Sequence, residues 1–191
     1  MRVDSRVGQW VGVAVIVGWC AVLGLLLPRW ADGSAPEAAK ELAGGQRVAV
    51  GGVSVSPADG WSQSTEVTDS LLLSKQDASI SFFPLEPAAG SLEDALTDKK
   101  AVFESDKSTT YDIGKPQEFS TDSGLKAVQL VVLAPGSANV LYAFSDGKQT
   151  VTALMASTDV SWQSLHDEIT TMMKSVRFTG VTSPTPSASP S

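Results

Sequence analysis

His166 is the only histidine of the chain, and it lies four residues after Trp162 in a segment with helical periodicity. An imidazole can act as a general base for a serine nucleophile, so a hydrolase using a serine and His166 is one hypothesis. The position also borders a predicted apolar stripe, where a histidine with a structural hydrogen bond is the simpler interpretation. The surrounding letters HDE do not form the zinc motif HExxH.

Two serines precede a lysine by three residues, in SGLK (123–126) and SDGK (145–148). Hydrolases with this motif need the serine and lysine one helical turn apart, so that the lysine meets the hydroxyl. Both matches lie in predicted turns beside strands, where that geometry is absent. GxSxG and glycine-rich phosphate loops are missing from the sequence.

Acidic side chains gather at the start of a predicted helix, at Glu93, Asp94 and Asp98. Carboxylates in this position are favoured by the helix dipole, and their spacing does not match a calcium loop. One histidine without cysteines in the soluble part cannot build a zinc site unless carboxylates complete it. We therefore predict a non-enzymatic protein with no catalytic residues, no metal and no cofactor.

Four aromatic residues mark where a pocket would form, if the domain has one: Trp61, Phe82, Phe83 and Trp162. Apolar pockets are commonly lined by aromatic side chains. For Phe82 and Phe83, as for Met172 and Met173, a place in the core is the simpler interpretation.

Most of the chain between residues 46 and 179 has the alternating pattern of β-strands. The segments at 69–74 and 78–85 flank a short polar turn, and Asp146-Gly147 is a tight-turn signal between two further strands. The strand segments are RVAVGGVSVSP (47–57), DSLLLS (69–74), ASISFFPL (78–85), YDIG (111–114), PQEFST (116–121), LKAVQLVVLAP (125–135), ANVLYAFSD (138–146) and QTVTALMAS (149–157).

Two helices are predicted among these strands. The first begins at Ser91, which forms a capping box with Asp94. The second spans residues 159–175 and carries Trp162, Leu165, Ile169, Met172, Met173 and Val176 on one face. Hairpin-length connections predict an antiparallel sheet, so the fold class is α+β with two main helices flanking the sheet.

The pattern and order of these elements resemble a known fold. The resemblance rests on four features of the sequence, taken in chain order: Val53, Val55, Pro57 and Trp61 near the start of the domain, the segment SFFPL, the predicted helix SLEDAL, and a final helix of the form Trp-x-x-Leu…Ser-Val-x-Phe. Together they look like the PsbP/Mog-like fold, and within it the LpqN-type actinobacterial envelope lipoproteins. The resemblance covers about 130 residues. It implies an exported, membrane-tethered domain used for binding or for assisting assemblies.

Residues 7–29 form a predicted transmembrane helix. A helix that spans the membrane needs about 20 apolar residues, which this segment supplies. Trp10 and Trp30 lie about 30 Å apart along such a helix, so each would lie at one membrane–water interface, where tryptophan is favoured. Arg2 and Arg6 precede the span, which predicts a cytoplasmic N-terminus and an extracytoplasmic remainder. Cys20, the one cysteine, falls mid-span. A cleavable signal peptide is an alternative, whereas lipidation is disfavoured because Trp19 precedes Cys20 and no lipobox is present.

These features divide the chain into five predicted parts. They are a cytoplasmic N-terminus (1–6), the transmembrane helix (7–29), a juxtamembrane connector with one or two helical turns (30–45), the α+β domain (46–179) and a disordered Ser/Thr/Pro-rich tail (180–191).

The charge of the chain bears on its partners. Three of the 14 basic and one of the 21 acidic residues lie in the first 29, which leaves 11 basic and 20 acidic residues beyond them. Such an acidic surface repels phosphate backbones and excludes nucleic-acid binding. We expect a membrane-anchored accessory domain of the bacterial cell envelope that binds a protein partner. The alternative is a carrier or chaperone for an apolar small molecule or lipid in a cleft between sheet and helix.

Overall fold

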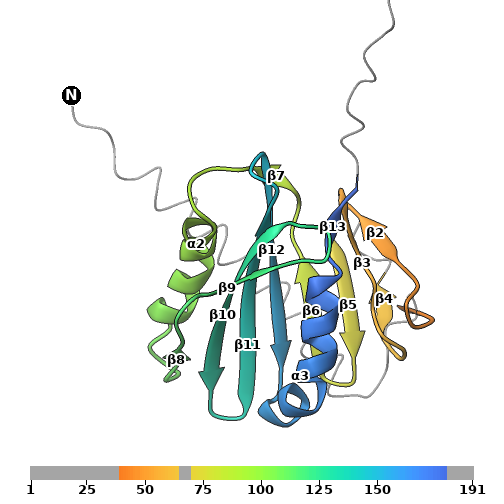
Figure 1. The fold of residues 1–191 in the computed structure, drawn as a ribbon. Coiled ribbons are helices and arrows are strands. Elements are labelled where there is room, and N and C mark those ends of the chain that lie inside the picture. The colour runs from red at the N-terminus through yellow and green to blue at the C-terminus, as the bar shows by residue number, and fades with distance from the viewer. Residues whose placement is uncertain (1–38, 65–69, 180–191) are drawn as a thin grey trace, which may run out of the picture. The chain divides into compact units, whose positions relative to one another are not determined.

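The computed structural model describes residues 39–64 and 70–179, and within them an antiparallel sheet carries one helix on each face (Figure 1). The elements are β1 (Ala39–Glu41), β2 (Val48–Val50), β3 (Val53–Val55), β4 (Ser62–Ser64), β5 (Leu71–Lys75), β6 (Ala78–Phe82), β7 (Glu86–Pro87), α2 (Leu92–Ser105), β8 (Asp112–Ile113), β9 (Gln117–Ser120), β10 (Lys126–Ala134), β11 (Ser137–Ser145), β12 (Gln149–Ser157), α3 (Asp159–Lys174) and β13 (Arg177–Phe178).

The main sheet has the strand order β1-β4-β5-β6-β12-β11-β10-β8, with β7 paired to β12 and β9 paired to β10. The central strands β10, β11 and β12 form two long hairpins, which explains why their apolar alternation was readable in the sequence. Strands β13, β3 and β2 form a separate small sheet. The sequence had predicted one sheet. The second arises because β3 pairs with β13 from the far end of the domain.

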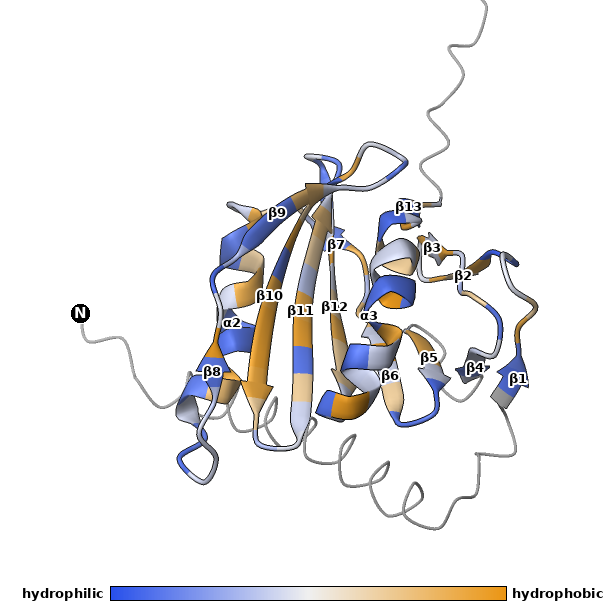
Figure 2. Cartoon of the chain, turned by 60° about the horizontal axis from the view of Figure 1, so that its bottom comes forward, coloured by the Kyte–Doolittle hydropathy of each residue, from blue (hydrophilic) through white to orange (hydrophobic). Residues whose placement is uncertain are grey.

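The two faces of the main sheet are buried unequally. The face toward α3 forms the main hydrophobic core of the domain. Its side chains that are at most 1% exposed include Tyr142, Phe144, Met155, Ile169, Met172 and Met173. On the opposite face, α2 contributes one buried residue, Leu96, which is 2% exposed. Figure 2 shows the apolar colouring along β10 that this burial requires. Helix α2 is therefore the less deeply packed of the two.

Both helices form where their sequences predict. Ser91 is the N-cap of α2, and the reciprocal capping box with Asp94 is present. Thr158 caps α3 by accepting from the N–H of Ser161. The predicted α+β class, with an antiparallel sheet and two main helices, is thus confirmed for the described residues.

The N-terminal boundary of the fold differs from the prediction. The predicted connector (30–45) contains strand β1, and Leu42 is 3% exposed and belongs to the core. Its backbone N–H donates to the carbonyl of Trp61 at 2.9 Å, which ties the segment to the domain. The expectation of helical turns in the connector is therefore wrong for residues 39–41, which form a strand, and the folded unit starts before residue 46.

The remaining boundary predictions fall on residues that the structure does not describe. These are the transmembrane helix (7–29), the cytoplasmic N-terminus (1–6) and the tail (180–191), all of which lie outside the described ranges. Among the helices of residues 39–64 and 70–179, none is long and apolar enough to cross a membrane.

Candidate functional site

The four aromatic residues singled out in the sequence do not gather around one pocket. Trp61 and Phe82 lie in the core, at 0% and 1% exposure. Trp162 is half-buried at the rim of the same cluster. Phe83 follows β6 and has the ammonium of Lys99 over its ring, 4.4 Å from the centroid. The interface between the sheet and α3 is mostly filled by side chains. The hollow that remains at its edge has a volume of about 100 Å³ and is lined in part by Phe119, Met173 and Lys174.

Helix α3 is fixed to the sheet by a polar cluster around Glu168. The indole N–H of Trp61 donates to Glu168 Oε1, and Lys75 Nζ lies 2.8 and 3.0 Å from the two carboxylate oxygens. Lys75 also donates to the carbonyl oxygen of Asp59 at 2.7 Å. Every donor here is matched to an acceptor, so the cluster links the loop before β4 and the end of β5 to helix α3, and we assign it no chemistry.

The residues considered for catalysis are not assembled into a reactive group. His166 is exposed, and its ring stands edge-on to Trp162 with centroids 4.6 Å apart. The hydroxyl of Ser123 donates to the carbonyl of Val176, and that of Ser145 to the carbonyl of Gln149. Both serines lie in or beside turns, as predicted, so neither meets its lysine on a helix.

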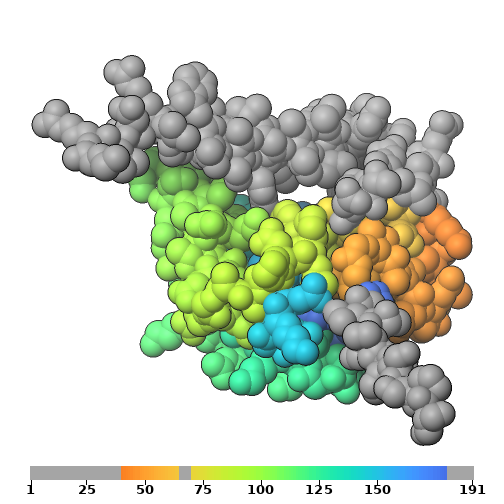
Figure 3. Space-filling view, turned by 90° about the horizontal axis from the view of Figure 1, so that it is seen from above, coloured from red at the N-terminus to blue at the C-terminus, as the bar shows by residue number. Residues whose placement is uncertain are grey.

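An open groove of about 570 Å³ lies at the end of the sheet where α2 begins. Sites for ligands commonly have volumes of roughly 300–1,000 Å³. Four segments line it: the start of α2, strand β9, the start of the following strand β10, and the β11–β12 turn. Viewed from above, the segment entering α2 lies beside that turn (Figure 3). We take this groove as the candidate functional site.

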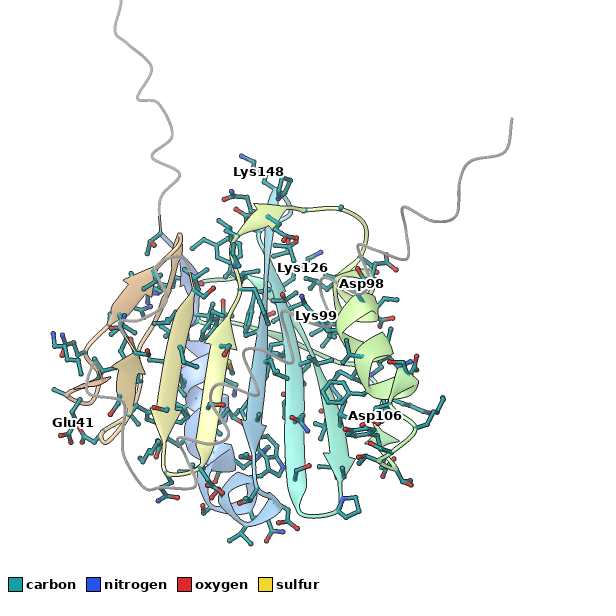
Figure 4. The ribbon with its side chains drawn as sticks, turned by 180° about the vertical axis from the view of Figure 1, so that it is seen from behind. Glu41, Asp98, Lys99, Asp106, Lys126 and Lys148 are labelled. Carbon is teal, nitrogen blue, oxygen red and sulfur yellow. The ribbon has the colours of Figure 1, made fainter. Side chains whose placement is uncertain are left out.

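Charged side chains line the groove. Glu93, Glu118 and Asp146 supply carboxylates, and Lys126 supplies one ammonium group. Glu118 and Lys126 stand on the α2 face of the sheet, because Glu118 pairs with Val128 and Lys126 lies two residues before it. Figure 4 shows Lys126 beside the helix that carries Asp98 and Lys99, with Glu41 at the opposite edge of the sheet.

The carboxylate of Asp146 is held by the turn that it closes. Its Oδ1 accepts from the backbone N–H groups of Lys148 and Gln149, both at 2.8 Å. The N–H of Gln149, followed by that of Lys148, lowers the pKa of Asp146 below its ordinary value. The group therefore stays charged into moderately acidic conditions and keeps this wall of the groove negative.

Sequence reasoning did not find this groove. Asp146 was identified as a turn residue and Lys126 as part of a chance motif, while Glu118 was one residue of a strand segment. Nothing in their sequence spacing signals that they converge, since the pairing of β9 with β10 and the packing of α2 bring them together.

Comparison with known proteins establishes the fold. No family model and no curated protein matches the chain. A solved structure that does match is the solution structure of cyanobacterial PsbP (CyanoP) from Synechocystis sp. PCC 6803, with a TM-score of 0.51 and 13% identity. The alignment covers 76% of this chain and 98% of that chain. At this identity the similarity is one of fold alone, and the described domain has a PsbP-like α+β fold.

Proposed function

We propose that this protein is a non-enzymatic accessory domain that binds a protein partner outside the cell membrane of a bacterium, to which residues 7–29 anchor it. The observation that carries the proposal is the groove at the start of α2. It is open, it is lined by residues from four segments, and its charged side chains are exposed. A partner can therefore reach it without any rearrangement of the fold.

The packing of the interior favours this function over that of a small-molecule carrier. A carrier would need an apolar cleft between sheet and helix. Tyr142, Ile169 and Met172 occupy that interface and are at most 1% exposed. Opening it would expose apolar side chains at a cost of about 25 cal/mol for each Å². The hollow that remains at the edge of this interface has a volume of about 100 Å³, which is smaller than the roughly 300–1,000 Å³ of sites for small molecules and disfavours the carrier alternative.

The envelope location is supported by the sequence and by the LpqN-type resemblance. The apolar span with its two flanking tryptophans supplies the tether, and the transmembrane helix would take the place of the lipid of that family. The acidic character of the chain beyond residue 29 gives the domain a negative surface, which favours encounter with basic partners.

The partner-binding proposal can be tested by photo-crosslinking of the full-length protein in its native cells. A photoreactive phenylalanine replaces Lys126 in the groove, and in the control it replaces Glu41 at the opposite edge of the sheet. We expect a reproducible protein adduct from position 126 and none of the same mass from position 41. The absence of any reproducible adduct at position 126, with the protein present at normal abundance, would refute the proposal.

The tether can be tested by washing membranes with alkaline carbonate. The protein should remain in the membrane fraction, and externally added protease should digest the domain in cells stripped of their wall. The Cys20→Ser variant should behave identically, because the apolar span and not a lipid on Cys20 provides the anchor. Recovery of the wild type in the soluble fraction would contradict the tether, and release of Cys20→Ser alone would indicate lipidation.

A further inference from the structure

We infer that the groove at the start of α2 receives a basic segment of the partner, with lysine or arginine side chains placed between Glu93, Glu118 and Asp146. This inference rests on the proposed function and adds the chemistry of the partner. The groove, its accessibility and its charge balance are the three observations that carry it.

The charge balance of the groove is negative. Three carboxylates line it, against the one ammonium of Lys126 in the lining, and Lys148 adds a second positive charge beside Asp146. Within the described ranges the ion pairs are Lys75–Glu168 and Lys100–Glu104, so Glu93 and Glu118 are not engaged in one. Both glutamates are exposed and remain available to an incoming cation.

The start of α2 does not turn the groove into an anion site. A helix N-terminus attracts negative charge, but α2 already satisfies this preference internally. Asp94 accepts from the backbone N–H and the hydroxyl of Ser91 at 2.8 Å each, and the Ser91 hydroxyl accepts from the N–H of Asp94. Glu93 and Asp94 both stand in the first turn. A negatively charged ligand would face these two carboxylates.

The size of the groove also fits a short peptide segment. About 570 Å³ accommodates a few residues of an extended peptide and exceeds the volume needed for a single ion. Paired contacts between exposed charges are individually weak, typically about 0.2–1 kcal/mol. Specific capture therefore needs several of them in one place, as the three carboxylates provide.

The inference is tested by measuring how fluorescein-labelled hexalysine and hexaglutamate bind to the full-length protein in neutral detergent. We expect hexalysine to bind more tightly. Glu118→Gln and Glu93→Gln should each weaken it about three- to fivefold, and Lys126→Gln should strengthen it by a similar factor. Glu41→Gln, which removes the same charge from an exposed glutamate at the opposite edge, should change the affinity by less than about 1.5-fold.

Three results would overturn the inference. Tighter binding of hexaglutamate, lost in Lys126→Gln, would show that the groove takes anions. If Glu41→Gln and Glu118→Gln weaken hexalysine binding equally, the peptide is attracted by the overall negative charge of the protein and not by the groove. Failure of both peptides to bind, alongside an adduct from position 126 in cells, would leave the partner-binding function standing and remove only the basic segment. Because all four substitutions are at exposed side chains, an unchanged unfolding curve verifies that each variant is folded.

Discussion

Trp61 and Glu168 are separated by 107 positions in the chain, and their hydrogen bond connects the loop before β4 to the middle of α3. The indole is fully buried, whereas the carboxylate is partly exposed and shared with Lys75. When a buried hydrogen-bond donor loses its acceptor, the free-energy cost of removing that donor from water is no longer offset. This contact is therefore expected to contribute more to stability than the exposed ion pair of α2.

Replacing Glu168 by Ala should reduce the free energy of unfolding by about 1–3 kcal/mol, since it leaves the Trp61 N–H without its acceptor. Glu168→Gln should cost less, because an amide oxygen can still accept that bond. Urea denaturation followed by tryptophan fluorescence measures both.

Glu104→Ala is the matched control for this prediction. It removes the same side chain from the Lys100–Glu104 pair, whose side chains are 41% and 52% exposed, and should cost about 0.5 kcal/mol or less. Equal losses in Glu168→Ala and Glu104→Ala would show that the Trp61 contact contributes nothing beyond an ordinary surface pair.

At the scale of elements, the parts that could be predicted are those whose signals are local. The capping box of α2 is formed by Ser91 and Asp94, which lie within four residues of each other. The 16-residue helix α3 has apolar residues at regular helical spacing along one face. The hairpin from β11 to β12 is predicted by the tight-turn dipeptide Asp146-Gly147. In each case the sequence that determines the element lies inside it.

The elements that were missed are short, and β7 and β13 among them pair with strands far away in the sequence. Strands β1, β4 and β7 have three, three and two residues, too few for an alternation to be recognised. Strand β13 has two residues and pairs with β3, more than one hundred positions earlier. Such strands are defined by the neighbour that they bond, and a single sequence does not reveal that neighbour.

The same reasoning explains the candidate site. The four aromatic residues were chosen by type, but exposure decides whether an aromatic side chain can bind anything. Burial places Trp61 and Phe82 in the core. The groove instead uses Glu118 and Lys126, ordinary charged residues that become neighbours only when β9 pairs with β10.

At the scale of the whole molecule, the described residues form a packed PsbP-like domain with an open groove, lined by three carboxylates, at the end of its sheet. The core is filled on the α3 side, and α2 covers the other face more loosely, with the groove at its first turn. Binding at this groove needs no change in the core, so substitutions there should alter partner capture without altering stability.

The most direct measurement of the central claim is the yield of the partner adduct from a photoreactive residue at position 126, compared with and without Glu93→Lys in the same chain. If the groove is the docking site and its carboxylates attract the partner, reversing this one charge should reduce the yield severalfold at equal protein abundance. An adduct of unchanged yield would contradict the claim that the carboxylates of the groove attract the partner, and the absence of any adduct at position 126 would contradict the assignment of the groove as the docking site.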